Sequence, residues 1–168
     1  MTSRTGAGRR VAVPVAVAAI SALAVAMLGA LMTELGDWYF GLRQPPWKPP
    51  DWLFGPAWTL IFALTAAAGV TAWRDMQGKA PREWLLVLFA LNGFLNVLWS
   101  LLFFRLQRPD WAQFEVAFLW LSIVVLIVFV GRHSRLAAAL LLPYLAWVSF
   151  AAVLNGAVVR LNAPFGGG

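Results

Sequence analysis

Five long apolar runs, separated by polar segments, dominate the chain. Each run is 20 to 24 residues long, and together they cover 11–33, 53–73, 84–104, 112–131 and 136–159. Four of them contain no Asp, Glu, Lys or Arg, and the remaining one contains only Glu115. A helix rises about 1.5 Å per residue, so each run matches the roughly 30 Å hydrocarbon core of a bilayer. The pattern predicts an all-α integral membrane protein built as a five-transmembrane-helix up-down bundle.

The first run has an alternative interpretation as a secretory signal peptide, because Arg9 and Arg10 precede it. The hydrophobic part of a signal peptide is 7–15 residues long and ends at a small-residue cleavage site. This run is 23 residues long and continues into "TELGDWYF", which favours a helix that is retained. We therefore expect a basic tail over 1–10, one membrane domain over 11–160 and a short tail over 161–168.

Composition supports the membrane assignment. The chain is 61% hydrophobic and 12% charged, with a mean hydropathy of +0.75, whereas soluble proteins carry about 25% charged residues. The net charge of +6 does not indicate a nucleic-acid partner, because the basic residues lie at the helix ends. Eight of the thirteen fall on the N-terminal side of the membrane and five on the other. If the protein lies in an inner membrane, this bias predicts a cytoplasmic N-terminus. We expect a bacterial membrane, and the sequence does not decide between the inner and the outer one.

The loop over 34–52 is the longest between apolar runs. Its second half and the start of the next run read "RQPPWKPPDWLFGPAW", which is rich in proline and tryptophan. Proline fixes φ and restricts the preceding residue, so this segment should be stiff. One interpretation is an aromatic belt at the interface. The other is a lid over the bundle that offers Trp47 to a ligand, with Arg43 and Lys48 placed to pair with ligand carboxylates.

Asn92, Asn96 and Ser100 recur every four residues and form one polar stripe on the helix over 84–104. Amides in hydrocarbon need partners, so the stripe must face protein or a cavity. Hydrogen bonds between helices and contacts to a ligand are both open, and Trp99 beside the stripe favours a ligand.

Trp147, Ala151 and Asn155 share one face of the helix over 136–159. A large ring above a small residue leaves room for a flat ligand, although ordinary packing explains the same pattern. Trp58 follows Gly55 at the start of its helix and is expected to point inward below the lid.

The sequence offers few groups for ordinary catalysis. Glu115 is expected to snorkel to the interface or to pair there with Arg105 or Arg108, with a proton relay as the lesser alternative. His133 is the only histidine and there is no cysteine, so no metal site, haem ligation or thiolate chemistry is expected. No cofactor is required on this interpretation, and a flat apolar molecule between indoles is the expected ligand.

Three segments resemble the tryptophan-rich sensory protein/translocator protein family (TspO, the peripheral-type benzodiazepine receptor). They read "WYFGLRQPPWKPPDWLFGPAWTLIF", "LNGFLNVLWSLLFF" and "LLLPYLAWVSFAAVLN". The resemblance implies a five-helix bundle, usually a homodimer, that binds porphyrins such as protoporphyrin IX, cholesterol-like sterols and isoquinoline carboxamides. Matching motif positions imply that the pocket is lined by Tyr39, Trp47, Trp58, Asn96 and Trp147.

The resemblance also implies that Trp58 and Trp147 match the tryptophans associated with light-dependent porphyrin breakdown in some members. One departure concerns sterols: the segment "LNGAVVR" has Gly156 and Ala157 where the family has an aromatic residue. A porphyrin receptor or sensor is therefore the leading hypothesis. A photo-oxidative porphyrin-degrading enzyme and a tetrapyrrole or lipid transporter are the alternatives.

Overall fold

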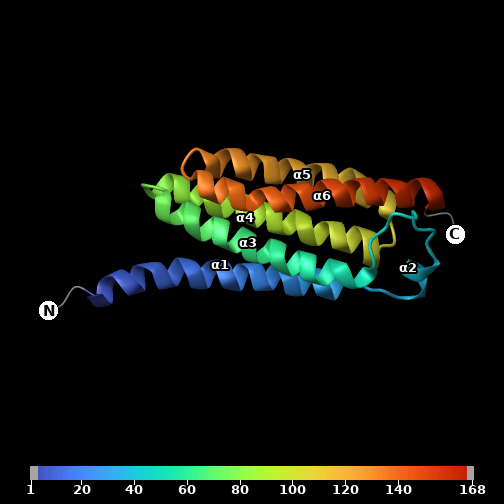
Figure 1. Ribbon diagram of the computed structural model, residues 1–168, viewed down its shortest axis with the longest axis horizontal. Helices are drawn as coiled ribbons and strands as arrows, with labels where there is room; N and C mark the ends of the chain where they lie inside the picture. Colours follow the sequence, from blue (N-terminus) through green and yellow to red (C-terminus); the bar gives the residue numbers. More distant parts are fainter. Residues whose placement is uncertain (1–3, 166–168) are drawn as a thin grey trace.

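The computed structural model describes the backbone of residues 4–165 and the side chains of residues 15–165. It contains five long helices, each apolar enough to cross a membrane (Figure 1). They are α1 (Arg4–Met32), α3 (Phe54–Asp75), α4 (Lys79–Ser100), α5 (Pro109–Gly131) and α6 (Arg135–Asn162). The predicted all-α bundle of five membrane-spanning helices is confirmed.

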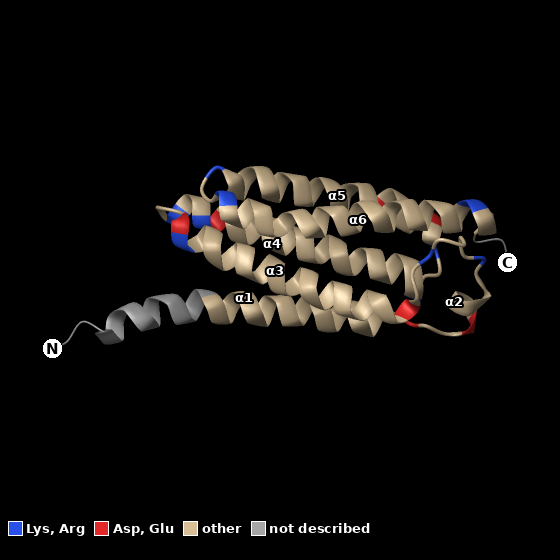
Figure 2. Cartoon of the chain, in the orientation of Figure 1, with Lys and Arg blue, Asp and Glu red and all other residues tan. Residues whose placement is uncertain are grey.

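Several helices extend beyond the apolar runs that predicted them. Helix α1 begins at Arg4 instead of residue 11, α4 begins at Lys79 instead of residue 84, and α6 continues to Asn162. Hydropathy marks only the part of a helix that lies in hydrocarbon, whereas backbone hydrogen bonding continues into the polar interface. Charged residues accordingly lie at the two ends of the bundle (Figure 2).

The five helices form a ring in which α1 packs on α3 and α4, α6 packs on α3 and α5, and α5 packs on α4. Helix α5 contributes a regular inner face that includes Val116, Leu119, Ile123 and Leu126. These positions recur at three- and four-residue intervals, as a buried helix face requires. By contrast, no residue of Val15–Met32 is fully buried. Helix α1 therefore lies at the edge of the bundle and leaves space beside α3, α4 and α6.

Tight turns hold the helix pairs together at the N-terminal end of the bundle. Gly78 precedes α4 with φ 90°, a backbone conformation that favours glycine. Ser134 caps α6, because its Oγ accepts a hydrogen bond from the amide of Ala137 at 3.3 Å. The turn at 132–134 makes α5 and α6 antiparallel neighbours, whereas α3 and α4 are joined by the turn at 76–78 but are separated by α1 in the ring.

The opposite end carries the lid loop, residues 34–52 (Figure 1). It contains a short helix, α2 (Asp37–Gly41). The 3-10 turn η1 (Asp51–Leu53) includes the last two residues of the loop and leads into α3. Helix α4 ends in a π-helical turn, η2 (Leu101–Arg105). Arg105 reaches from this turn to the end of α1, where it donates to the Leu31 carbonyl at 3.2 Å and to Glu34 at 3.0 Å.

Candidate functional site

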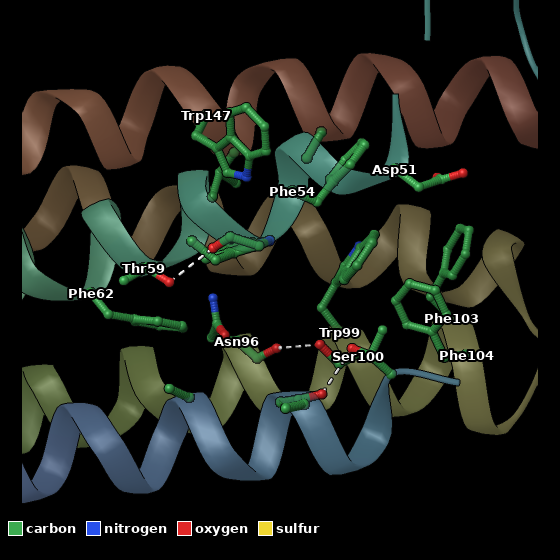
Figure 3. A pocket seen from close by; sticks show the side chains of 18 of the residues that line it. Asp51, Phe54, Thr59, Phe62, Asn96, Trp99, Ser100, Phe103, Phe104 and Trp147 are labelled. Atoms are coloured by element: carbon green, nitrogen blue, oxygen red, sulfur yellow. Dashed lines mark hydrogen bonds between the residues drawn. The ribbon is translucent and has the colours of Figure 1, made fainter. Parts of the chain in front are cut away.

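A cavity of about 1040 Å³ lies inside the bundle beneath the lid loop. All five long helices and the lid loop contribute to its wall, which is mostly apolar and aromatic (Figure 3). Eight of the residues expected at the site line it: Tyr39, Lys48, Trp58, Asn96, Trp99, Trp147, Ala151 and Asn155. The structure therefore brings together groups from the lid loop, α3, α4 and α6 that are far apart in the sequence. We call this space the aromatic cavity.

Three tryptophans from three helices form its aromatic walls. Trp99 of α4 stacks on Phe103, with ring centroids 5.1 Å apart and planes 19° apart. Trp58 of α3 stacks on Phe62, with ring centroids 5.3 Å apart. Trp147 of α6 packs edge-on against Phe54, with ring centroids 5.6 Å apart. Each indole is held by an aromatic neighbour, so its orientation is fixed before any ligand arrives. Ala151 lies one turn beyond Trp147, and its small side chain leaves space in the cavity beside the indole.

Three residues that line the aromatic cavity each carry a buried polar atom without a partner. Among the described residues, the indole Nε1 atoms of Trp99 and Trp147 and the Oδ1 atom of Asn155 have no hydrogen-bond partner. The amide nitrogen of Asn155 is satisfied, because it donates to the Pro109 carbonyl at 3.1 Å. A buried polar group without a partner costs about 1–3 kcal/mol. These three atoms are covered by neighbouring protein groups, so the polar groups that face the aromatic cavity come from other side chains, such as Lys48 and Ser100.

The polar stripe of α4 divides between the two roles that the sequence left open. Asn92 donates to Ser122 of α5 at 2.8 Å and does not line the aromatic cavity, so it links two helices. Asn96 donates to the hydroxyl of Tyr144 on α6 at 3.1 Å and also lines the cavity. Ser100 lines the cavity as well. The part of the stripe that faces the cavity is therefore its lid end.

Three residues of the lid loop form a hydrogen-bonded group at the cavity wall. The Tyr39 hydroxyl donates to Asp51 at 2.6 Å, and the Lys48 ammonium donates to the same carboxylate oxygen. Lys48 is only 14% exposed and lies 5.3 Å from the centre of the Tyr39 ring. Burial, together with the Asp51 carboxylate, raises the pKa of Tyr39, so its hydroxyl remains a donor. Lys48 was expected to pair with ligand carboxylates, but its charge is already neutralised by Asp51.

Two expected site residues of the lid loop lie outside the aromatic cavity. Trp47 is 48% exposed and packs edge-on against Phe150 of α6, with ring centroids 6.0 Å apart. Arg43 instead fastens the loop through its backbone, whose N–H and C=O both bond to the Asn162 side chain, at 2.8 and 2.9 Å. The lid loop lines the cavity with Tyr39, Lys48 and other residues and not with Trp47.

Glu115 differs from its expected role. It is 6% exposed, and both carboxylate oxygens lack a hydrogen-bond partner among the described residues. The two expected partners are engaged elsewhere, because Arg105 pairs with Glu34 and Arg108 pairs with Asp110. The predicted interfacial ion pair of Glu115 is therefore wrong.

Sequence reasoning missed the contribution of α1. This helix presents small residues to the aromatic cavity, namely Ala19, Ala22, Ala26, Gly29 and Ala30. Their spacing of three or four residues marks one helix face, which was the available signal. Helix α1 approaches α4 closely at Gly93, where an added Cβ would lie 2.9 Å from a methyl group of Val25.

Comparison with known proteins places the chain in a family. The model of the TspO/MBR family matches residues 12–161. The chain belongs to the TspO/MBR family. It is 40% identical over 146 residues to the tryptophan-rich protein TspO of Chlorobaculum tepidum, covering 83% of this chain and 90% of that one. It is 38% identical over 146 residues to the tryptophan-rich protein TspO of Archaeoglobus fulgidus, covering 86% and 94%. It is 33% identical over 132 residues to the human translocator protein, covering 78% of each chain.

Membership of the TspO/MBR family and the five apolar helices agree that this is a multi-pass integral membrane protein. The matched region includes the lid loop and every residue named at the aromatic cavity. The site described above therefore lies entirely within the part of the chain that the family shares.

Proposed function

We propose that this protein is a membrane receptor or sensor that binds porphyrins of the protoporphyrin IX type in the aromatic cavity. The observation that carries the proposal is a space of about 1040 Å³ with Trp58, Trp99 and Trp147 in its walls. Ligand pockets are usually about 300–1000 Å³, so this one suits a large ligand. The names of relatives, which include tryptophan-rich sensory protein and translocator protein, are consistent with a receptor role.

Each part of the aromatic cavity has a task in such binding. The indole faces pack against the macrocycle, and each aromatic pair contributes about 0.5–1.5 kcal/mol beyond buried area. Ser100 and Asn96, which line the cavity, are the polar groups of α4 closest to the polar edges of the macrocycle. A peripheral carboxylate would bind at Lys48, where it shares the ammonium with Asp51.

Titration of the purified protein in detergent with protoporphyrin IX tests the proposal. The experiment is done in the dark and follows tryptophan fluorescence and porphyrin absorbance. The double variant Trp58→Phe with Trp147→Phe should bind about tenfold or more weakly, because two large aromatic faces that contact the macrocycle shrink. Trp120→Phe is the matched control, since Trp120 donates to Ser149 and lies outside the aromatic cavity. Equal affinity of wild type and double variant would contradict the site.

A second candidate function is photo-oxidative porphyrin breakdown, with dioxygen as the oxidant. It is favoured by the position of Trp58 and Trp147 in the same cavity. Illumination of the porphyrin complex in air should then generate a new absorbing product, and the double variant should not. Porphyrin binding without any such product would support the receptor and not the enzyme. Vectorial porphyrin uptake into sealed vesicles would instead indicate a transporter.

Two further parts of the proposal concern sterol binding and dimer formation. An added Cβ at Gly156 would lie 3.6 Å from atoms of Gln113 and Arg160, so these side chains adjoin the position where the family has an aromatic residue. Because Gly156 and Ala157 replace that aromatic residue, a sterol lacks this contact here, and we propose that porphyrins bind more tightly than sterols. We also propose a homodimer in a bacterial membrane, which light scattering of the detergent-solubilised protein tests.

A further inference from the structure

We propose a second binding site, at the other end of the bundle, for the phosphate of an anionic phospholipid. It is a groove of about 560 Å³ at the turn between α3 and α4. We call it the basic groove; its lining residues are Trp73, Gly78, Lys79, Arg82, Glu83 and Leu86. It shares no residue with the aromatic cavity, and the proposal does not depend on porphyrin binding.

The charge of the protein is distributed unequally between the ends of the bundle (Figure 2). At the lid end, five basic residues are matched by five acidic ones: Glu34, Asp37, Asp51, Asp110 and Glu115. At the other end, the described side chains include five basic residues and only two acidic ones. The basic ones are Arg74, Lys79, Arg82, Arg132 and Arg135, and the acidic ones are Asp75 and Glu83. The net excess of positive charge therefore lies at the end that contains the basic groove.

Arg82 is the central group of the basic groove. Its Nη2 donates to the Met76 carbonyl at 3.0 Å, and its guanidinium lies 5.2 Å from the centre of the Trp73 ring. These two contacts fix the guanidinium plane. Its Nε–H is buried and has no partner among the described residues. The buried Nε–H is not accessible to a ligand, so the guanidinium would meet phosphate oxygens through its terminal nitrogens, an arrangement to which a planar, oriented guanidinium is suited.

The surroundings of Arg82 fit a lipid headgroup. Lys79 is 90% exposed and its contact with Glu83 is 3.4 Å long, so its ammonium remains accessible to an anion. Helix α4 begins at Lys79 without a side-chain cap, which places the positive end of its dipole beside the groove. Leu86, which lines the groove, and the exposed Trp84 lie one to two turns beyond Lys79 on α4, and exposed tryptophan is typical of the membrane interface. Basic side chains are thus followed along α4 by apolar ones, in the order in which a phospholipid presents its phosphate and its acyl chains.

Native mass spectrometry of the detergent-solubilised protein, titrated with phosphatidylglycerol or phosphatidylcholine of the same acyl chains, tests the site. Wild type should retain phosphatidylglycerol preferentially. Arg82→Gln and Lys79→Gln should each weaken phosphatidylglycerol binding about fivefold, the effect of one basic residue at an anionic surface. Arg135→Gln is the control, because it removes the same charge at the same end outside the basic groove. Lys79→Gln changes an exposed side chain, so its result does not depend on altered folding.

Three results would overturn the proposal. Equal weakening by Arg82→Gln, Lys79→Gln and Arg135→Gln would show a general charge effect in place of a site. Equal retention of phosphatidylcholine and phosphatidylglycerol would remove the requirement for an anionic headgroup. Complete competition by inorganic phosphate at equimolar concentration would assign the groove to free phosphate instead of lipid.

Discussion

The attachment of the lid loop to α6 through Asn162 can be tested by removing one side chain. In Asn162→Ala, the backbone N–H and C=O of Arg43 lose their partners at 2.8 and 2.9 Å. A hydrogen bond contributes about 0.5–1.5 kcal/mol net, and both groups are exposed, so water replaces part of the loss. We expect the docked lid to be destabilised by about 1–2 kcal/mol, which lowers the docked-to-open ratio about 5–30-fold.

Amide hydrogen exchange measured by mass spectrometry reports this ratio directly. Peptides covering 36–50 should exchange faster in Asn162→Ala, while peptides from α5 should not change. Asn162→Asp should be intermediate, because its carboxylate still accepts from the Arg43 amide but cannot donate to the Arg43 carbonyl. Unchanged exchange of the lid peptides in Asn162→Ala would refute the reasoning that this side chain holds the loop closed.

Three further predictions concern the interior and the lid. Gly93→Leu should lower the free energy of unfolding by about 1–3 kcal/mol in detergent, because its side chain meets Val25 and pushes α1 off α4; an unchanged value would show that α1 adjusts freely. Glu115→Met should raise the same free energy by about 1–3 kcal/mol, since it removes buried oxygens without partners; a decrease would reveal a partner for the carboxyl. Asp51→Asn should strengthen binding of protoporphyrin IX relative to its dimethyl ester about fivefold in parallel titrations, because it releases Lys48; equal affinities would place the carboxylates elsewhere.

The helices could be predicted because hydropathy and length suffice for membrane spans. The site was partly predictable for a related reason: Asn96 and Trp147 are unusual residues in apolar helices, so they mark places where hydrocarbon is not the neighbour. The α1 wall was harder, because alanines such as Ala22 and Ala26 suit lipid contact and a cavity equally well.

The errors came from long-range pairing, which helical spacing does not encode. Asn92 and Asn96 lie on the same stripe, yet one bonds to Ser122 and the other faces the aromatic cavity. The position of Trp47 depends on where the lid loop attaches, and that attachment is made by Asn162, 119 residues from Arg43 in the sequence. Glu115 was paired with nearby arginines by proximity along the chain, whereas the π-helical turn at η2 directs Arg105 toward α1.

A structure determined with protoporphyrin IX bound tests the central claim most directly. We expect the macrocycle in the aromatic cavity, between the indoles of Trp58, Trp99 and Trp147. We also expect a peripheral carboxylate of the porphyrin within hydrogen-bonding distance of the Lys48 ammonium. A porphyrin bound on the lipid-facing surface, with the cavity beneath the lid loop unchanged, would contradict it.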